Sequence, residues 1–133
     1  MQTRTLFTAS SLYMGAVGLA LMAVPMQFGI GAVPGNASSE LIALLRLLGG
    51  PFLGISVLNW LARRETEDAP LRPILIANFI GFLSVAANDL VGVISGTARP
   101  VAAYFLVVHA VFALAFGYAW RRRGFANGPP DPR

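Results

Sequence analysis

The sequence contains no cysteine. This excludes disulfide bonds, thiolate metal sites, iron–sulfur clusters and cysteine nucleophiles. The sequence also lacks a His-Glu-x-x-His motif, a glycine-rich phosphate loop after a strand, and a serine placed with histidine and aspartate in a recognisable motif. We therefore predict no catalytic residue and no metal site, and we lean against an enzyme.

Charge is equally scarce. Charged residues make up 12% of the chain and hydrophobic residues 56%, and that charged share is about half of what an ordinary soluble domain carries. A chain of 133 residues has room for one domain, and a domain of this size cannot bury so much apolar surface. The composition predicts a membrane protein, which would be surrounded by the lipid bilayer.

All the positively charged side chains are arginines, and the net charge is +4. Most of them cluster where the predicted helices would meet water. Such charge is typical of topology signals and lipid-facing surfaces, and we predict no nucleic-acid partner.

The apolar residues fall into four runs, and crossing a bilayer takes about 20 residues. We expect an all-α fold, a four-helix transmembrane bundle over residues 1–123, with helices at about 6–30, 40–62, 71–96 and 101–120. Residues 124–133, rich in proline, should form a disordered cytoplasmic tail. A cleaved signal peptide is the competing interpretation of the first run, but that run exceeds the roughly 7–15 residues of a signal core.

The second helix should start at Glu40, with the hydroxyl of Ser39 as its cap and the acid of Glu40 in its first turn. Pro51 should kink this helix, because proline removes the hydrogen bond to the carbonyl of Leu47. The turn at 97–100 is very short, so the third and fourth helices should be antiparallel neighbours.

Arginine counts predict the orientation. One side of the membrane would have only Arg99 between helices, and the other would have eight arginines: Arg4, Arg63, Arg64, Arg72, Arg121, Arg122, Arg123 and Arg133. The positive-inside rule then places both termini in the cytoplasm. Trp60, Tyr118 and Trp120 would fall at the inner interface, where aromatic belts lie.

Three ionisable residues share one predicted layer of the outer half of the membrane. At about 1.5 Å of rise per residue, Arg46 lies roughly 9 Å, Asp89 roughly 11 Å and His109 roughly 13 Å below the outer helix ends. An acid inside a span costs several kcal/mol unless it is paired. We expect Arg46, with His109 nearby, to neutralise Asp89.

Other polar and small residues follow helical spacing. Asn59 and Asn78 share a layer near the inner surface and could bond each other. Two glycine pairs match the small-residue spacing that lets membrane helices approach closely: Gly50 with Gly54, and Gly92 with Gly96. One predicted face of the third helix combines both kinds of residue: Asn78, Gly81, Val85, Asp89, Gly92 and Gly96.

The polar layer has two interpretations. It could pin the helices in register, or it could relay protons or ions, because intramembrane carboxylates and histidines are the usual relay groups. A nearby arginine keeps an aspartate ionised, which makes it a poor carrier. This favours the structural interpretation.

His109 could hold a pigment, which needs one ligand, or a haem with a methionine as second axial ligand. The chain has one histidine, and antenna helices often place alanine four residues before the pigment ligand, where this chain has Phe105. We predict no cofactor, with a pigment or haem at His109 as the alternative.

Several short runs together form a recognisable pattern: Leu45-Arg46-Leu47-Leu48-Gly49-Gly50, Leu53-Gly54, Leu58-Asn59-Trp60-Leu61-Ala62-Arg63, Leu71-Arg72, Ala77-Asn78 and Ser95-Gly96. The pattern resembles that of a group of small, uncharacterised bacterial four-helix membrane proteins. The resemblance implies a bacterial inner-membrane protein with four spans and carries no activity. Asp89 and His109 lie outside the pattern.

The leading hypothesis is a non-catalytic membrane subunit or assembly factor that packs against a larger complex, respiratory or photosynthetic. A small homo-oligomeric transporter or channel that uses Arg46, Asp89 and His109 is the alternative. A protein that binds lipid, quinone or pigment is the third. The sequence determines neither the partner, nor the oligomeric state, nor a ligand.

Overall fold

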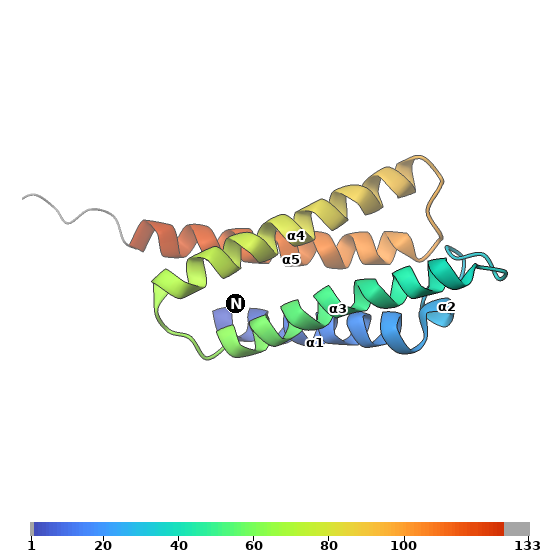
Figure 1. Cartoon of the computed structure of the whole chain (residues 1–133). Coiled ribbons are helices and arrows are strands. Elements are labelled where there is room, and N and C mark those ends of the chain that lie inside the picture. The colour runs from blue at the N-terminus through green and yellow to red at the C-terminus, as the bar shows by residue number, and fades with distance from the viewer. Residues whose placement is uncertain (1, 127–133) are drawn as a thin grey trace, which may run out of the picture. The chain divides into compact units, whose positions relative to one another are not determined.

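The computed structural model describes residues 2–126, and within them all regular structure is helical. The chain divides into two compact units, Met1–Arg64 and Glu65–Arg133, each of which contains one helical hairpin (Figure 1). The helices are α1 (Thr3–Ala23), α2 (Pro25–Phe28), α3 (Ser39–Ala62), α4 (Asp68–Ile94) and α5 (Ala102–Ala126).

Four of these helices, α1, α3, α4 and α5, are long and apolar enough to cross a membrane. The prediction of an all-helical fold with four helices able to span a membrane is confirmed. Helix α5 extends to Ala126, so residues 124–126, assigned to the tail from the sequence, are helical. The rest of the predicted disordered tail, 127–133, lies outside the described residues.

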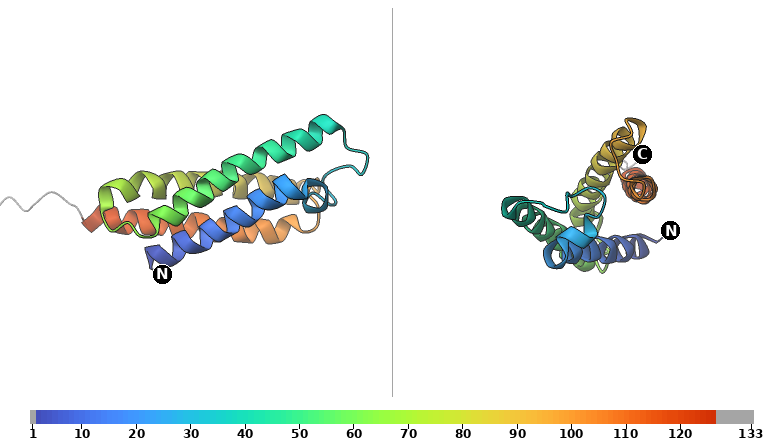
Figure 2. Two further views of the ribbon diagram at one scale, coloured as in Figure 1. Left: turned by 60° about the horizontal axis from the view of Figure 1, so that its bottom comes forward. Right: turned by 90° about the vertical axis from the view of Figure 1, so that its right-hand side faces the viewer.

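The first hairpin pairs α1 with α3 in antiparallel orientation, and the two helices lie side by side in both views of Figure 2. The buried residues of α1 recur at intervals of three and four, which places them along one face of the helix. They are Leu6, Phe7, Ser10, Ser11, Met14, Gly18 and Leu21. Gly49, Asn59 and Ala62 are the buried residues of α3.

The first apolar run is divided, where the sequence predicted one segment to about residue 30. Helix α1 ends at Ala23 and α2 starts with Pro25. Proline has no N–H to continue a helix but fits the first turn of a new one. Gly31, with φ of +81°, lies in the loop that follows.

Helix α3 starts one residue earlier than predicted. The hydroxyl of Ser38, not that of Ser39, caps it by accepting from the Leu41 amide at 3.3 Å, and Glu40 lies in the first turn as expected. Pro51 lies inside α3, which stays continuous from Ser39 to Ala62. The kink at Pro51 remains a prediction.

The second hairpin pairs α4 with α5, as the short turn between them predicted. Gly96, with φ of +68°, reverses the chain after α4, and the amides of Thr97 and Ala98 both donate to the carbonyl of Gly92. A left-handed glycine after the last turn is a common way for a helix to end. The buried residues of α4 are Leu71, Leu75, Asn78, Phe82 and Ala86.

Candidate functional site

The most distinctive polar contact lies inside the second hairpin. His109 of α5 and Asp89 of α4 meet with Nδ1 and Oδ2 2.6 Å apart, and their side chains are only 12% and 16% exposed. An ionised carboxylate can only accept, so with Asp89 ionised the histidine Nδ1–H donates. The structure therefore brings together two of the three residues that the sequence placed in one layer.

Aromatic rings surround this pair. The His109 ring centroid lies 6.1 Å from that of Phe105 and 6.2 Å from that of Phe82. Phe82 also stacks on Phe112 at 4.7 Å and on Phe116 at 5.8 Å. These rings keep the local polarity low, which strengthens the electrostatic attraction across the contact.

The buried face of α4 differs from the predicted one. Phe82 and Ala86 are buried, whereas Gly81 and Val85, which the sequence assigned to the polar face, are exposed. Neighbouring residues on a helix point about 100° apart, and the rings of α5 select Phe82 over the smaller Gly81. Asp89 does lie toward α5, where it meets His109.

Arg46, the third member of the predicted layer, lies on α3 in the other hairpin and is exposed there. It makes no ion pair with the described residues of its own hairpin. Its pairing with Asp89 stays a prediction, as does a pigment or haem at His109.

The first hairpin holds a second polar cluster, which sequence reasoning largely missed. The hydroxyl of Ser11 donates to the Ser56 carbonyl, and that of Ser56 donates to the Ser11 carbonyl, both at 2.8 Å. One turn away, the amide of Asn59 donates to the hydroxyl of Ser10 at 3.1 Å. Phe7, Ser11 and Gly18 recur at helical spacing, and this pattern could have indicated which face of the first helix contacts its partner.

The amide nitrogen of Asn78 donates to the Ile74 carbonyl of its own helix at 2.9 Å. Serine and asparagine often satisfy themselves in this way inside helices. The bond between Asn59 and Asn78 that the layer suggested stays a prediction.

The glycines that bring α1 and α3 together are Gly18 and Gly49. A Cβ at Gly49 would lie 2.7 Å from the Gly18 carbonyl oxygen and 2.4 Å from a Met22 side-chain carbon. Nothing lies within 4 Å of a Cβ at Gly50 or Gly54. These two predicted packing glycines thus point away from α1.

Of the other predicted packing pair, Gly92 lies in the last turn of α4 and Gly96 in the turn that follows it. A Cβ at Gly92 would lie 3.0 Å from the Ala98 Cβ, so its small size lets residues 97 and 98 fold back over the helix end. Gly96 lies beyond the last residue of α4.

At the opposite end of the second hairpin, Arg123 and Asp68 form an ion pair. It joins the last turn of α5 to the first turn of α4. Each charge also suits its helix end, because acids stabilise helix N-termini and bases stabilise C-termini.

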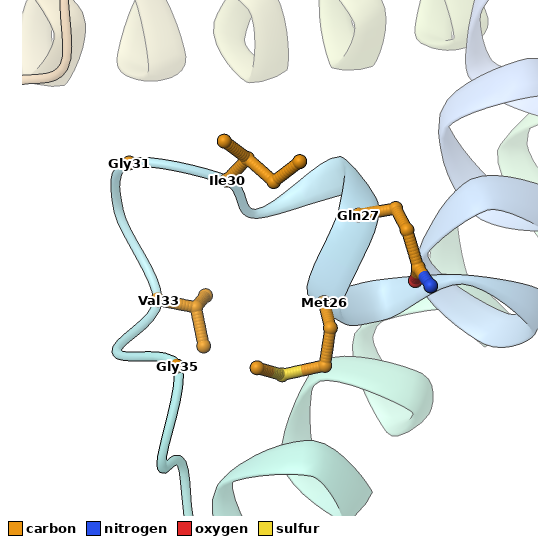
Figure 3. Close-up of a pocket in the computed structure, with 6 residues that line it drawn as sticks. All are labelled: Met26, Gln27, Ile30, Gly31, Val33 and Gly35. Carbon is orange, nitrogen blue, oxygen red and sulfur yellow. The ribbon is translucent and has the colours of Figure 1, made fainter.

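An open pocket of about 350 Å³ lies in the segment that joins α1 to α3. Figure 3 shows Met26 of α2 and Val33 of the following loop on opposite sides of it. Its lining is mostly apolar and contains no charged residue: Met26, Gln27, Ile30, Gly31, Val33 and Gly35. It offers no group for acid–base or nucleophilic chemistry.

Among residues 2–126, no group of three or more histidine, aspartate or glutamate side chains is placed to hold a metal ion. Comparison of the chain with protein-family models, with curated proteins and with solved structures finds no match. The site must therefore be interpreted from its own geometry.

Proposed function

We propose that the protein is a non-catalytic accessory or assembly subunit of a larger complex in a bacterial inner membrane. The observation that carries this proposal concerns the face of α3 that points away from α1. Arg46, Gly50 and Gly54 recur there every fourth residue, all three are exposed, and a Cβ at either glycine would meet nothing within 4 Å.

This face suits another helix better than lipid alone. Small residues let a neighbouring backbone approach closely. An arginine within a span is costly unless it finds an acidic or carbonyl partner, and Arg46 has no ion pair in its own hairpin. The partner we propose for Arg46 is an acid at matching depth, either Asp89 of this chain or an acid of another subunit. A respiratory or photosynthetic complex is the kind of host that would need such a subunit.

The test is purification in mild detergent. We expect the wild type to bring down stoichiometric membrane partners, and a Gly50→Leu/Gly54→Leu variant to lose them while keeping its helix content. Gly81→Leu is the matched control, because Gly81 is exposed on α4 and a Cβ there also meets nothing within 4 Å. A wild-type protein that elutes alone would contradict the proposal.

The contact between Asp89 and His109 favours a second candidate, a small homo-oligomeric transporter or channel. A histidine and a carboxylate 2.6 Å apart can exchange a proton, and such groups line proton paths in membranes. Reconstitution in liposomes, with Asp89→Asn as control, decides between the two. Flux lost in the variant supports transport, whereas intact flux or no flux in the wild type counts against it.

Binding of lipid, quinone or pigment beside His109 is the third proposal. The aromatic side chains around the imidazole would suit a flat ligand. A molecule that co-purifies with the wild type and is lost from His109→Leu would support it.

A further inference from the structure

One end of the first hairpin gathers positive charge without compensation. Because α1 and α3 are antiparallel, the first turn of α1, with Arg4, lies at the same end as Arg63 and Arg64, which follow α3. Within the described chain, none of these three arginines forms an ion pair.

Arg63 is the best-positioned of the three. Its guanidinium carbon lies 3.5 Å from the ring centroid of Trp60, so the planar group stacks on the indole. Its Nε is buried and has no hydrogen-bond partner in the described structure. Stacking holds one face of the guanidinium, and no acceptor among the described residues bonds its N–H groups.

The electrostatic surroundings of Arg63 favour binding of an anion. Burial, followed by the charges of Arg64 and Arg4, lowers the pKa of Arg63. The carboxylate of the nearby Glu65 already accepts from the amides of Thr66 and Glu67. The first turn of α1 contains no acid and no side-chain cap, so the positive end of the helix dipole adds to the potential there.

We propose that Arg4, Arg63 and Arg64, with Trp60 as the stacking platform, form a binding site for the phosphate of an acidic phospholipid headgroup. Arginine binds phosphate through paired N–H donors, and tryptophan prefers the membrane interface. The site lies at the end of two apolar spans, where lipid phosphates are concentrated. This inference requires the spans to cross a membrane and does not depend on the proposed subunit role.

The experiment measures binding of phosphatidylglycerol to the full chain in mild detergent. The chain has two tryptophans, so Trp120→Phe leaves Trp60 as the fluorescence reporter. Phosphatidylcholine serves as the neutral comparison, and inorganic phosphate as the soluble competitor. Since a basic residue near an anionic surface contributes about 1 kcal/mol, Arg63→Gln and Arg64→Gln should each weaken binding about fivefold.

Arg122→Gln is the matched control, because Arg122 also lies over an aromatic ring, that of Tyr118 at 5.6 Å, but in the other hairpin. It should leave the Trp60 response unchanged. Arg63→Lys keeps the charge and loses the planar fork, so we expect an intermediate loss. If Arg63→Gln fails to fold, Arg4→Gln and Arg64→Gln, at exposed positions, carry the test.

Three results would overturn the proposal. Phosphatidylcholine could bind as tightly as phosphatidylglycerol, which would show that the site does not recognise the net negative charge of the headgroup. Arg122→Gln could weaken binding as much as Arg63→Gln, which would show general charge attraction only. Inorganic phosphate could displace the lipid at comparable concentration, which would make this a site for soluble phosphate.

Discussion

At the scale of single residues, the chain places its few polar groups where a second helix can satisfy them. Ser11 and Ser56 exchange hydrogen bonds across the first hairpin, and Asp89 meets His109 across the second. In hydrocarbon no water is present to replace these partners. Polar contacts therefore help to hold the register of helices whose surfaces are mostly apolar.

The Asp89–His109 contact should appear as coupling between the two side chains. We expect the double variant Asp89→Leu/His109→Leu to be more stable than the sum of the single variants predicts, by about 0.6–1.7 kcal/mol, the range for hydrogen bonds between membrane helices. A double-mutant cycle in SDS-induced unfolding measures it. Additive single effects would show that the contact contributes no coupling.

Glu65 should titrate below its ordinary range. The amides of Glu67 and Thr66 donate to its carboxylate and lower its pKa from the usual 4.5. Because the folded-state pKa is the lower one, the loop gains stability above the unfolded pKa and loses it as the pH falls through the folded pKa. The amide resonances of Thr66 and Glu67 should therefore shift together, with a midpoint below 4.5.

Glu65→Gln is the control for this titration, because the amide side chain keeps an acceptor oxygen and cannot ionise. It should remove the pH-dependent shift and leave the helices intact. A midpoint at or above 4.5 in the wild type would contradict the assigned hydrogen bonds.

At the scale of helices, the crossing of α1 and α3 depends on glycine facing glycine. The Gly18 and Gly49 backbones approach so closely that a Cβ on Gly49 would lie 2.7 Å from a carbonyl oxygen. Backbone oxygen cannot rotate away as a side chain can. One methyl group at this point must therefore separate the helices.

We expect Gly49→Ala to destabilise the first hairpin by about 1–3 kcal/mol, the usual cost of overpacking. Gly50→Ala, one residue further on, should be neutral or stabilising by up to about 1 kcal/mol, because alanine favours helix and nothing lies near its Cβ. Thermal unfolding in detergent compares them. Equal effects of the two substitutions would argue against this crossing.

At the scale of the whole molecule, four apolar helices and the distribution of arginine define a topology that can be tested directly. The absence of cysteine permits single-cysteine variants without prior substitution. Gly35, between α2 and α3, and Thr66, between α3 and α4, are both exposed. Since one long helix separates them, they should lie on opposite sides of the membrane.

The predicted orientation has both termini in the cytoplasm, so an impermeant maleimide should label Gly35→Cys in spheroplasts. Thr66→Cys should react only after the membrane is permeabilised. The measurement is gel-shift labelling of each variant before and after permeabilisation. The reverse pattern would invert the topology, and labelling of both at once would rule out a span between them.

The class of protein and the existence of the four long helices could be predicted from the amino-acid sequence alone. Hydrocarbon demands about 20 apolar residues for each span and an internal partner for every backbone polar group, so length and composition suffice. Glu40 in the first turn of α3 and the tight turn after α4 follow from local chemistry in the same way.

Which residues of a helix surface face inward became clear only from the folded hairpins. Gly49 rather than Gly50, and Phe82 rather than Gly81, face the partner helix. Adjacent residues point about 100° apart, and on a mostly apolar helix the few polar residues do not fix the rotation that closely. For the same reason His109 emerged as the partner of Asp89, and Ser10 and Ser11 as partners of α3. Such contacts depend on rotation and register, which are set by the packing of two complete surfaces.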